Sequence, residues 1–548
     1  MGLVTILRGY AESDDASEAC SHRIDSIIPK MKGNIGVWCC VGVIVTLLWN
    51  ALRVLNWVWF KPKKIEKFLR NQGLKGSSYR FLYGDMKDLG KMLKEAKSKP
   101  IGLTDDIVPR VSPFYHQSLT VHGKNCFTWM GPRPVLHITE PAMIREIFTN
   151  NYQFPKARGR SPFIKLIVAG LADAEANRWS KHRKIINPAF HVEKLKHMVP
   201  AFYMSCAELI KKWEEMLKNK RSCEVDVLPY LQTLSCDLIS STAFGSNFEE
   251  GKRIFELQKE QAELVRQVIQ SVYIPGSIYL PTKRNKRLKE TDREVKASIR
   301  SIIHKRMIAM KDGECSKNDL LGILLDSSYH EIKQHGNINF GLSIDEVIEE
   351  CKVFYFAGQE TTGNLLCWTM ILLAQHANWQ IRAREEVLLV CGEKKPDIDE
   401  LNRLKTVNMI FNEVLRLYPP VVTMVRMIHE ETKLGDITAP AGSILQLHTI
   451  FLHHDRDVWG DDVKDFNPAR FSEGVSNATK GQAAAYFPFG GGPRTCIGQN
   501  FALLEVKMAL AMILQHFRFD LSPSYSHAPH TIITLQPQFG AHLILHKL

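Results

Sequence analysis

Apolar residues recur every three or four positions along most of the chain, a pattern that predicts helices. The last clearly periodic segment begins with Ser343 and Glu346, a capping-box pair whose side chains satisfy exposed amides at a helix start. At about 1.5 Å per residue this helix would be on the order of 50 Å long. It is apolar almost all round in mid-course, so we expect a buried central helix. The periodicity is clearest at residues 192–216, 252–273, 288–310 and 343–376.

Strand-like and turn-like pieces gather between residues 100 and 160. Phe127-Thr-Trp-Met130 and Pro134-Val-Leu-His137 are the clearest of them, and they predict a small sheet. No obvious linker interrupts the chain after the first seventy residues. The expected fold class is therefore mainly α with a small β region, in one large domain.

An apolar run near the N-terminus predicts a membrane anchor. Residues 35–60 exceed the roughly 20 residues that a bilayer requires. Aromatic residues end the run and lysines follow at once, which places the body on the cytoplasmic side. A buried core helix is the alternative reading. The predicted division is a tail at 1–34, the transmembrane anchor at 35–60, a basic linker at 61–75 and the catalytic domain at 76–548.

The tail carries acidic residues such as Asp14, Glu18 and Asp25, whereas an organelle transit peptide is normally poor in acids. We therefore expect a single-pass signal anchor in the endoplasmic reticulum membrane. Met1 and Met31 both stay open as the start of the product. The net charge of +13 suits a membrane surface, an acidic partner or nucleic acid. No zinc-finger spacing or recognition-helix signature accompanies the charge, so we expect no nucleic-acid partner.

The 12 cysteines are scattered, as is usual in a reducing compartment. One of them, Cys496, lies in the sequence FPFGGGPRTCIGQNFA, after three glycines and just before an apolar helical stretch. Helix-start amides and the helix dipole favour a thiolate at such a position. Amides of Ile497 and Gly498 are placed to hydrogen-bond the sulfur.

The spacing of Phe489, Gly492, Arg494, Cys496 and Gly498 resembles the haem-binding signature of the cytochrome P450 monooxygenases. The resemblance implies the cytochrome P450 fold, a haem b cofactor, and an iron whose axial ligand is the thiolate of Cys496. A guanidinium gives two directed hydrogen bonds, so Arg494 is expected to pair with a haem propionate. A structural cysteine in a glycine loop is the alternative.

Ala357-Gly-Gln-Glu-Thr-Thr362 interrupts the central helix with residues that are unfavourable in a helix interior. Threonine hydroxyls there are expected to bond back to the preceding turn and widen the helix. The resemblance implies that Thr361 takes part in oxygen activation and that Glu360 relays protons. A polar kink in a core helix is the alternative.

Further residues gain meaning from the resemblance. Trp179 and Arg183 lie one helical turn apart, and with Arg426 they are expected to contact the haem propionates. An ordinary surface or packing role is the alternative for each.

Glu413-x-x-Arg416 resembles the family's buried ion network, although Glu290-x-x-Arg293 has the same spacing. Arg470 completes the network, but Ala469 stands where many relatives have glutamate.

Finer motifs resemble the plant group that contains secologanin synthase and triterpenoid oxidases. They are Tyr273-Ile-Pro-Gly, Leu280-Pro-Thr-Lys-Arg-Asn-Lys-Arg287 and Gln536-Pro-Gln-Phe-Gly540. The resemblance implies oxidation of a small apolar metabolite, of iridoid, triterpenoid or gibberellin type, with electrons from NADPH-cytochrome P450 reductase. Lys181, His182 and Lys184 are expected to attract that reductase. A haem-thiolate isomerase or dehydratase and a non-catalytic haem protein remain the alternatives.

Overall fold

The structure, a computed structural model, describes residues 40–156, 162–245, 248–269, 274, 276–312, 319–337 and 340–548. The predicted tail, the first five residues of the predicted anchor, Met31, Tyr273 and Pro275 lie outside these ranges. The chain divides into two compact units, residues 1–64 and 65–548, and each is described by itself.

The first unit contains most of an apolar helix that runs from Cys40 to Asn71. A π-helical turn, η1 (Asn56–Phe60), precedes its last part, α3 (Lys61–Asn71). The most apolar stretch has a mean hydropathy of 1.6, so the helix is long and apolar enough to cross a membrane. Side chains such as Val43 and Leu47 are exposed along it. This helix therefore fits a single-pass membrane anchor.

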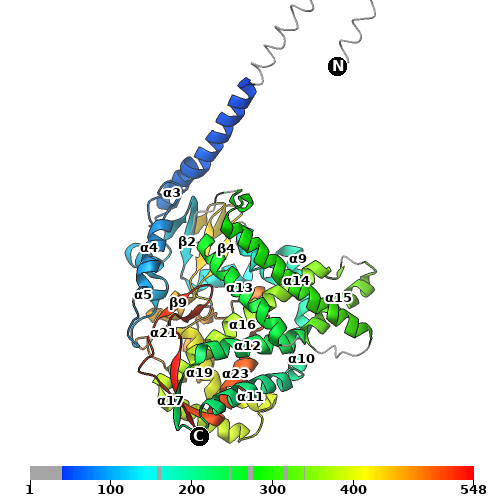
Figure 1. Ribbon diagram of the computed structural model, residues 1–548. Helices are drawn as coiled ribbons and strands as arrows, with labels where there is room; N and C mark the ends of the chain where they lie inside the picture. Colours follow the sequence, from blue (N-terminus) through cyan, green and yellow to red (C-terminus); the bar gives the residue numbers. More distant parts are fainter. Residues whose placement is uncertain are drawn as a thin grey trace, which may run out of the picture. The chain divides into compact units, whose positions relative to one another are not determined.

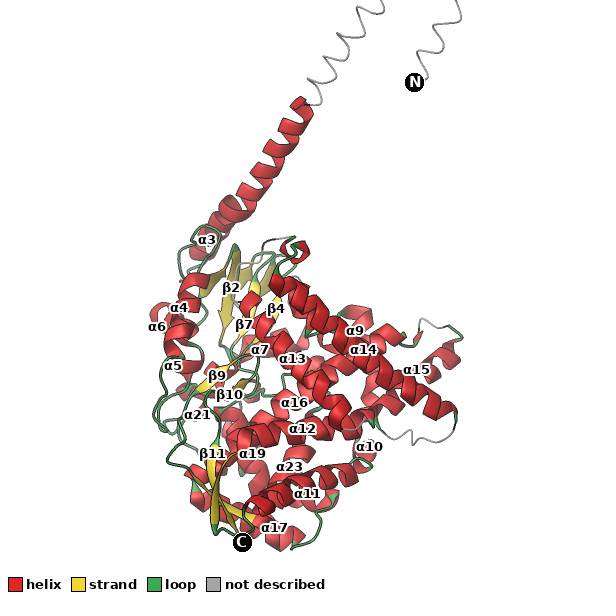
Figure 2. Ribbon diagram, viewed as in Figure 1, coloured by secondary structure: helices red, strands yellow, loops and turns green. Residues whose placement is uncertain are grey.

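Helices dominate the second unit, as the periodicity predicts (Figure 2). They are α4 (Met86–Ala96), α5 (Val108–Val111), α6 (Pro113–His122), α7 (Pro141–Thr149), α8 (Gly170–Asp173), α9 (Ala176–Ile186), α10 (Val192–Lys196), α11 (Val199–Met216), α12 (Val227–Phe244), α13 (Phe248–Ile269), α14 (Lys283–Lys311), α15 (Leu320–His335), α16 (Ile344–Gln375), α17 (Ala377–Cys391), α18 (Ile398–Arg403), α19 (Lys405–Leu417), α20 (Thr449–His453), α21 (Arg456–Trp459), α22 (Gly474–Ala478) and α23 (Gln499–His516).

The strands form small sheets beside the helices (Figure 2). The largest has the order β1 (Phe127–Met130), β2 (Arg133–Ile138), β7 (Ile444–Leu447), β4 (Met424–Met427). Its first two strands confirm the predicted sheet, and only the β2–β7 pair within it is parallel. The others are a sheet of β3 (Ser222–Asp226), β11 (His542–Lys547) and β8 (Phe517–Leu521), and two hairpins, β5 (Thr432–Leu434) with β6 (Ile437–Ala439) and β9 (Pro529–Thr531) with β10 (Leu535–Pro537).

The predicted central helix is α16, and its capping box is present. The side chain of Ser343 accepts from the amide of Glu346 at 3.2 Å, and Glu346 accepts from the amide of Ser343 at 3.1 Å. In contrast, the predicted helix 192–216 is two helices, α10 and α11. Pro200 lies in the first turn of α11, where its missing N–H costs no hydrogen bond.

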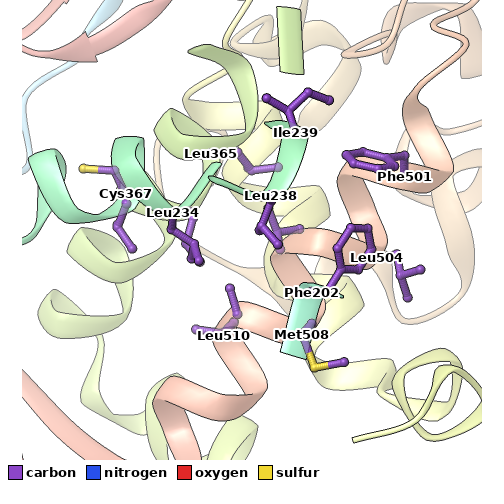
Figure 3. Close-up of a cluster of buried hydrophobic side chains, with 14 of the residues drawn as sticks. Phe202, Leu234, Leu238, Ile239, Leu365, Cys367, Phe501, Leu504, Met508 and Leu510 are labelled. Atoms are coloured by element: carbon purple, nitrogen blue, oxygen red, sulfur yellow. The ribbon is translucent and has the colours of Figure 1, made fainter. Parts of the chain in front are cut away.

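The core of the second unit lies between α16 and its neighbours α11, α12 and α23, which cross near one another (Figure 1). Figure 3 shows Leu234 and Leu238 of α12 packed among Leu365 of α16 and Leu504 of α23. The side chain of Ile239 on α12 packs directly against Gly358 on α16. A Cβ there would lie 2.9 Å from the Cδ1 atom of Ile239, so close packing accounts for this mid-helix glycine.

Candidate active site

The cysteine loop closes as a tight double turn before α23. The amide of Cys496 donates to the carbonyl of Phe489 at 2.9 Å, and the amide of Gly490 donates to the carbonyl of Phe487 at 2.9 Å. Gly490 and Gly492 have φ values of +77° and +63°, a region that favours glycine. Cys496 stands three residues before Gln499, the first residue of α23, so it precedes the apolar helix as predicted.

Packing against α7 requires two of the three consecutive glycines. A Cβ at Gly491 would lie 2.6 Å from Cδ2 of Phe148, and a Cβ at Gly492 would lie 2.2 Å from the Phe148 carbonyl oxygen. The glycines were expected to let the backbone approach a flat cofactor. At Gly491 and Gly492 the structure gives a different reason, because the C-terminal end of α7 packs closely against both residues.

The Cys496 side chain has accessible surface. Even so, burial raises the pKa of its thiol, an effect that the Gly498 amide and the nearby Arg183 and Lys156 only partly offset. The sulfur therefore keeps accessible surface although surrounding protein atoms desolvate it. The Gly498 amide favours the thiolate in the predicted direction, but desolvation of the sulfur outweighs this effect in the protein alone. A bound metal cation reverses that balance, since a coordinating thiol is deprotonated.

Two of the residues predicted to contact the haem propionates, Arg183 and Arg494, lie beside the cysteine loop. Nη1 of Arg183 donates to the Thr495 carbonyl at 3.0 Å. Nη1 of Arg494 donates to the Ala174 carbonyl at 2.7 Å, and its Nη2 forms an ion pair with Glu175.

The Arg494 guanidinium also lies 4.7 Å from the ring centre of Trp179. Trp179 and Arg183 share helix α9, four residues apart, as expected. The structure thus brings Trp179, Arg183, Arg494 and Cys496 together, with the Phe489 carbonyl bound to the Cys496 amide.

Lys156 is a residue of this site that no sequence motif marks. Its backbone forms a β-bridge with Arg426, and its Nζ donates to the Ala172 carbonyl at 2.8 Å. Burial and the charges of Arg426 and Arg494 lower the pKa of Lys156 to about 8. Lys156 and Arg426 are far apart in the sequence, so no local sequence pattern predicts that they are in contact.

Arg426 lies in the same field of positive charge. Burial and, to a smaller extent, Arg494 lower its pKa to about 10. Among the residues that the structure describes, Glu175 and Asp173 are the acids that act on Lys156, and Glu175 also acts on Arg426 and pairs with Arg494. Three described cations thus lie near two described carboxylates, and Arg183 lies nearby. Such an excess fits a ligand that carries its own carboxylates next to the sulfur. Haem, with two propionates, has the required chemistry.

His182 is not part of a positive surface, contrary to expectation. The ring is fully buried; its Nδ1 contacts Glu350, and its Nε2 lies 3.3 Å from Glu346. Lys181 and Lys184 form ion pairs with Glu346 and Glu331, at 3.5 and 2.8 Å. His182 therefore joins α9 to α16, and the two lysines are partly neutralised.

On α16, Thr361 donates to the carbonyl of Ala357 at 2.6 Å, the predicted bond to the preceding turn. The helix continues as α-helix through this point, so the expected widening is not seen. Glu360 accepts a hydrogen bond from Thr534 at 2.9 Å, and burial raises the pKa of its carboxyl. Neither residue forms a hydrogen bond or ion pair with the cysteine loop within the described part of the chain.

The predicted ion network is present and fully buried at its centre. Nε and Nη2 of Arg416 donate to the two oxygens of Glu413 at 2.8 and 2.7 Å. Arg470 adds an ion pair with Glu413 at 3.6 Å. This network holds α19 against the segment before the cysteine loop.

Comparison with known proteins identifies the family. The family model described as Cytochrome P450 matches residues 113–540. The chain is 61% identical to Cytochrome P450 CYP72A219 of Panax ginseng, over 94% of this chain and 98% of that protein. It is 58% identical to Cytochrome P450 72A397 of Kalopanax septemlobus, over 91% of this chain and 95% of that protein. Secologanin synthase 1 of Catharanthus roseus is 52% identical, over 91% of this chain and 95% of that protein.

Members of this family bind haem through a cysteine thiolate and are monooxygenases. The mostly helical fold, the N-terminal helix and the similarity to plant relatives agree with that assignment. With its thiol beside buried cations, this chain belongs to the cytochrome P450 family and is a haem-containing plant monooxygenase.

Proposed function

We propose that this monooxygenase takes electrons from NADPH-cytochrome P450 reductase and oxidises a small apolar terpenoid. It would do so at the endoplasmic reticulum membrane, with the catalytic domain facing the cytoplasm. The observation that carries the proposal is the accessible thiol of Cys496 beside a buried excess of cations. The similarity to Secologanin synthase 1 supports a terpenoid substrate, and we propose one of iridoid, triterpenoid or gibberellin type.

Haem, when bound, supplies the iron that activates dioxygen. The sulfur of Cys496 would hold that iron, and the hydrogen bond from the Gly498 amide would tune the charge on the sulfur. The Phe489 carbonyl fixes the loop through the Cys496 amide. The groups that we propose for the haem propionates are the side chains of Trp179, Arg183, Arg426, Arg494 and Lys156.

Glu360 and Thr361 are the proposed catalytic pair. A carboxyl with a raised pKa holds a proton more readily at neutral pH, and it can pass that proton from its oxygen atoms. Thr361 is bound to the Ala357 carbonyl through its hydroxyl hydrogen, which leaves the oxygen of that hydroxyl free to accept. A proton held at Glu360 and an acceptor at Thr361 are the components of a relay.

Microsomes that contain this protein, with and without reductase, test the proposal. They would be supplied with iridoid, triterpenoid and gibberellin precursors, and products would be identified by mass spectrometry. We expect an oxidised product only when both NADPH and reductase are present. Turnover without reductase would indicate an isomerase or dehydratase, and haem binding with no product from any precursor would contradict the proposed substrate class.

The relay is tested in the same microsomes with Thr361→Ala and Glu360→Gln. Thr361→Ala is expected to divert electrons to hydrogen peroxide, which raises the peroxide formed per NADPH. Thr369→Ala is the matched control, because Thr369 makes the same bond to the preceding turn of α16, at 2.8 Å, but is fully buried. Unchanged peroxide formation in Thr361→Ala would remove the proposed role.

A further inference from the structure

One ridge of α16 faces the turn of the β9–β10 hairpin. Glu360, Asn364 and Trp368 are spaced four residues apart, so they lie on one side of the helix. Each forms a hydrogen bond with the hairpin. Glu360 and Asn364 both contact the Thr534 hydroxyl at 2.9 Å, and Nε1 of Trp368 donates to the Leu535 carbonyl at 3.1 Å. The hairpin is therefore fixed to the helix beside the Glu360 carboxyl.

The direction of the two bonds at Thr534 is set by Asn364. Nδ2 of Asn364 can only donate, so the Thr534 oxygen accepts from it. The hydroxyl hydrogen of Thr534 is then free to be donated to Oε1 of Glu360. Thr534 is 3% exposed and Asn364 is fully buried, so water does not compete readily for these bonds.

The surroundings of Glu360 have opposing effects on the pKa of its carboxyl. Burial has the largest effect and raises the pKa of the carboxyl, whereas the bond from Thr534 lowers it. Lys259 on α13 is the charged group that acts on the carboxyl, and it also lowers the pKa. Lys259 is exposed, so solvent screens its charge. Among these groups, Thr534 is the one that contacts Glu360 directly and fixes the position of Oε1.

We propose that Thr534 is a positioning residue for Glu360. Its hydroxyl, oriented by Asn364, holds one carboxyl oxygen against the hairpin and leaves the other to exchange protons. This inference rests on the proposed proton-relay function of Glu360, and it assigns to the hairpin a part in setting how readily that carboxyl is protonated.

Infrared difference spectroscopy of the full-length, haem-loaded protein tests the proposal without turnover. The carbonyl stretch of protonated Glu360 is isolated by subtracting the spectrum of Glu360→Gln, and its intensity is followed against pH. Thr534→Val removes the hydroxyl and keeps the side-chain shape. We expect Glu360 in this variant to stay protonated to a higher pH than in the wild type, because the hydrogen bond that favours the carboxylate is lost.

Thr534→Ser is the rescue variant and is expected to titrate as the wild type does. Thr531→Val is the matched control on the same hairpin, since the Thr531 hydroxyl has no hydrogen-bond partner among the residues that the structure describes. If Thr534→Val does not fold, Thr534→Ala gives the same comparison. An unchanged Glu360 titration in the folded Thr534 variant, or an equal shift in Thr531→Val, would overturn the proposal.

The outcome for the proposed function is separate. If Glu360→Gln supports normal coupling of NADPH oxidation to product, Glu360 is not the relay. The infrared shift in Thr534→Val would still show that the hairpin positions the carboxyl.

Discussion

Asp462 accepts hydrogen bonds from both Nη atoms of Arg470, at 2.9 Å each. Nη2 of Arg470 also donates to the Asp462 carbonyl at 3.0 Å. The residue before this arginine is Ala469, which supplies no carboxylate. Asp462, which lies earlier in the chain, supplies the second carboxylate of the network. Both of its carboxylate oxygens accept hydrogen bonds from Arg470.

Asp462→Asn is expected to weaken the domain modestly. The aspartate side chain is 43% exposed, so solvent screens the pair and the loss in unfolding free energy should be about 1 kcal/mol. Glu413→Gln is the contrasting variant. It leaves Arg416 without a charged partner in a fully buried place, which should cost about 3–5 kcal/mol. Urea unfolding followed by circular dichroism measures both. Equal losses would refute the difference in burial as the cause.

Cys496→Ala is expected to abolish haem-thiolate ligation. Without the sulfur, the carbon-monoxide difference spectrum of a thiolate-bound haem should disappear, while the far-ultraviolet circular dichroism remains helical. Cys223→Ala is the control, because Cys223 lies on strand β3 and is only partly buried. A variant that kept the thiolate spectrum would exclude Cys496 as the ligand.

Lys156→Met is expected to stabilise the haem-free protein but to weaken haem binding. The pKa of Lys156 is lowered in the folded chain, so below about pH 8 a proton must be held there at a cost to folding. Removing the charge should raise the melting temperature of the haem-free chain at pH 7. In the haem-bound protein the same change removes a proposed propionate partner, and haem loss to apomyoglobin should accelerate about ten-fold. Lys165→Met, at an exposed position nearby in sequence, should change neither.

Glu505→Gln is expected to remove a pH dependence of stability. Burial raises the pKa of Glu505 to about 8 from a usual 4.5, and the hydroxyl of Ser235 donates to it at 2.8 Å. The folded protein thus binds a proton that the unfolded chain releases, and stability falls as the pH rises from about 4.5 to 8. The stability of Glu505→Gln should therefore vary less with pH between about 4.5 and 8, and this variant should be more stable than the wild type at pH 8.

Thermal unfolding at several pH values measures the effect of Glu505→Gln. Glu385→Gln, at an exposed position on α17, is the control. A wild-type melting temperature that did not fall between pH 5 and 8 relative to Glu505→Gln would contradict the raised pKa.

Sequence patterns predicted features that depend on local order. Helix α16 follows from its capping box and its apolar middle, and the predicted segment 343–376 brackets its observed bounds, Ile344–Gln375. The helix after Cys496 follows from an apolar run in the same way. In contrast, α12 is buried on nearly all sides, so its apolar residues show no single face and the periodicity does not mark it.

The parts of the site that could not be predicted depend on contacts distant in sequence. Lys156 reaches Arg426 through a β-bridge that only the folded sheet creates. His182 lies in a basic run, but consecutive residues of a helix point to different sides, and this one turns inward to Glu350. No sequence motif marks Thr534, because its role depends on its hydrogen bonds with Glu360 and Asn364 of α16.

The crowding of Lys156, Arg426 and Arg494 bears on how the protein matures. Positive groups that repel one another in the haem-free fold would lose that repulsion once an anionic prosthetic group is bound, so we expect porphyrin binding to stabilise the folded domain. The yield of intact protein in a recombinant host should therefore depend on the host's porphyrin supply, and polypeptide made in excess of that supply would be the preferred target of its proteases.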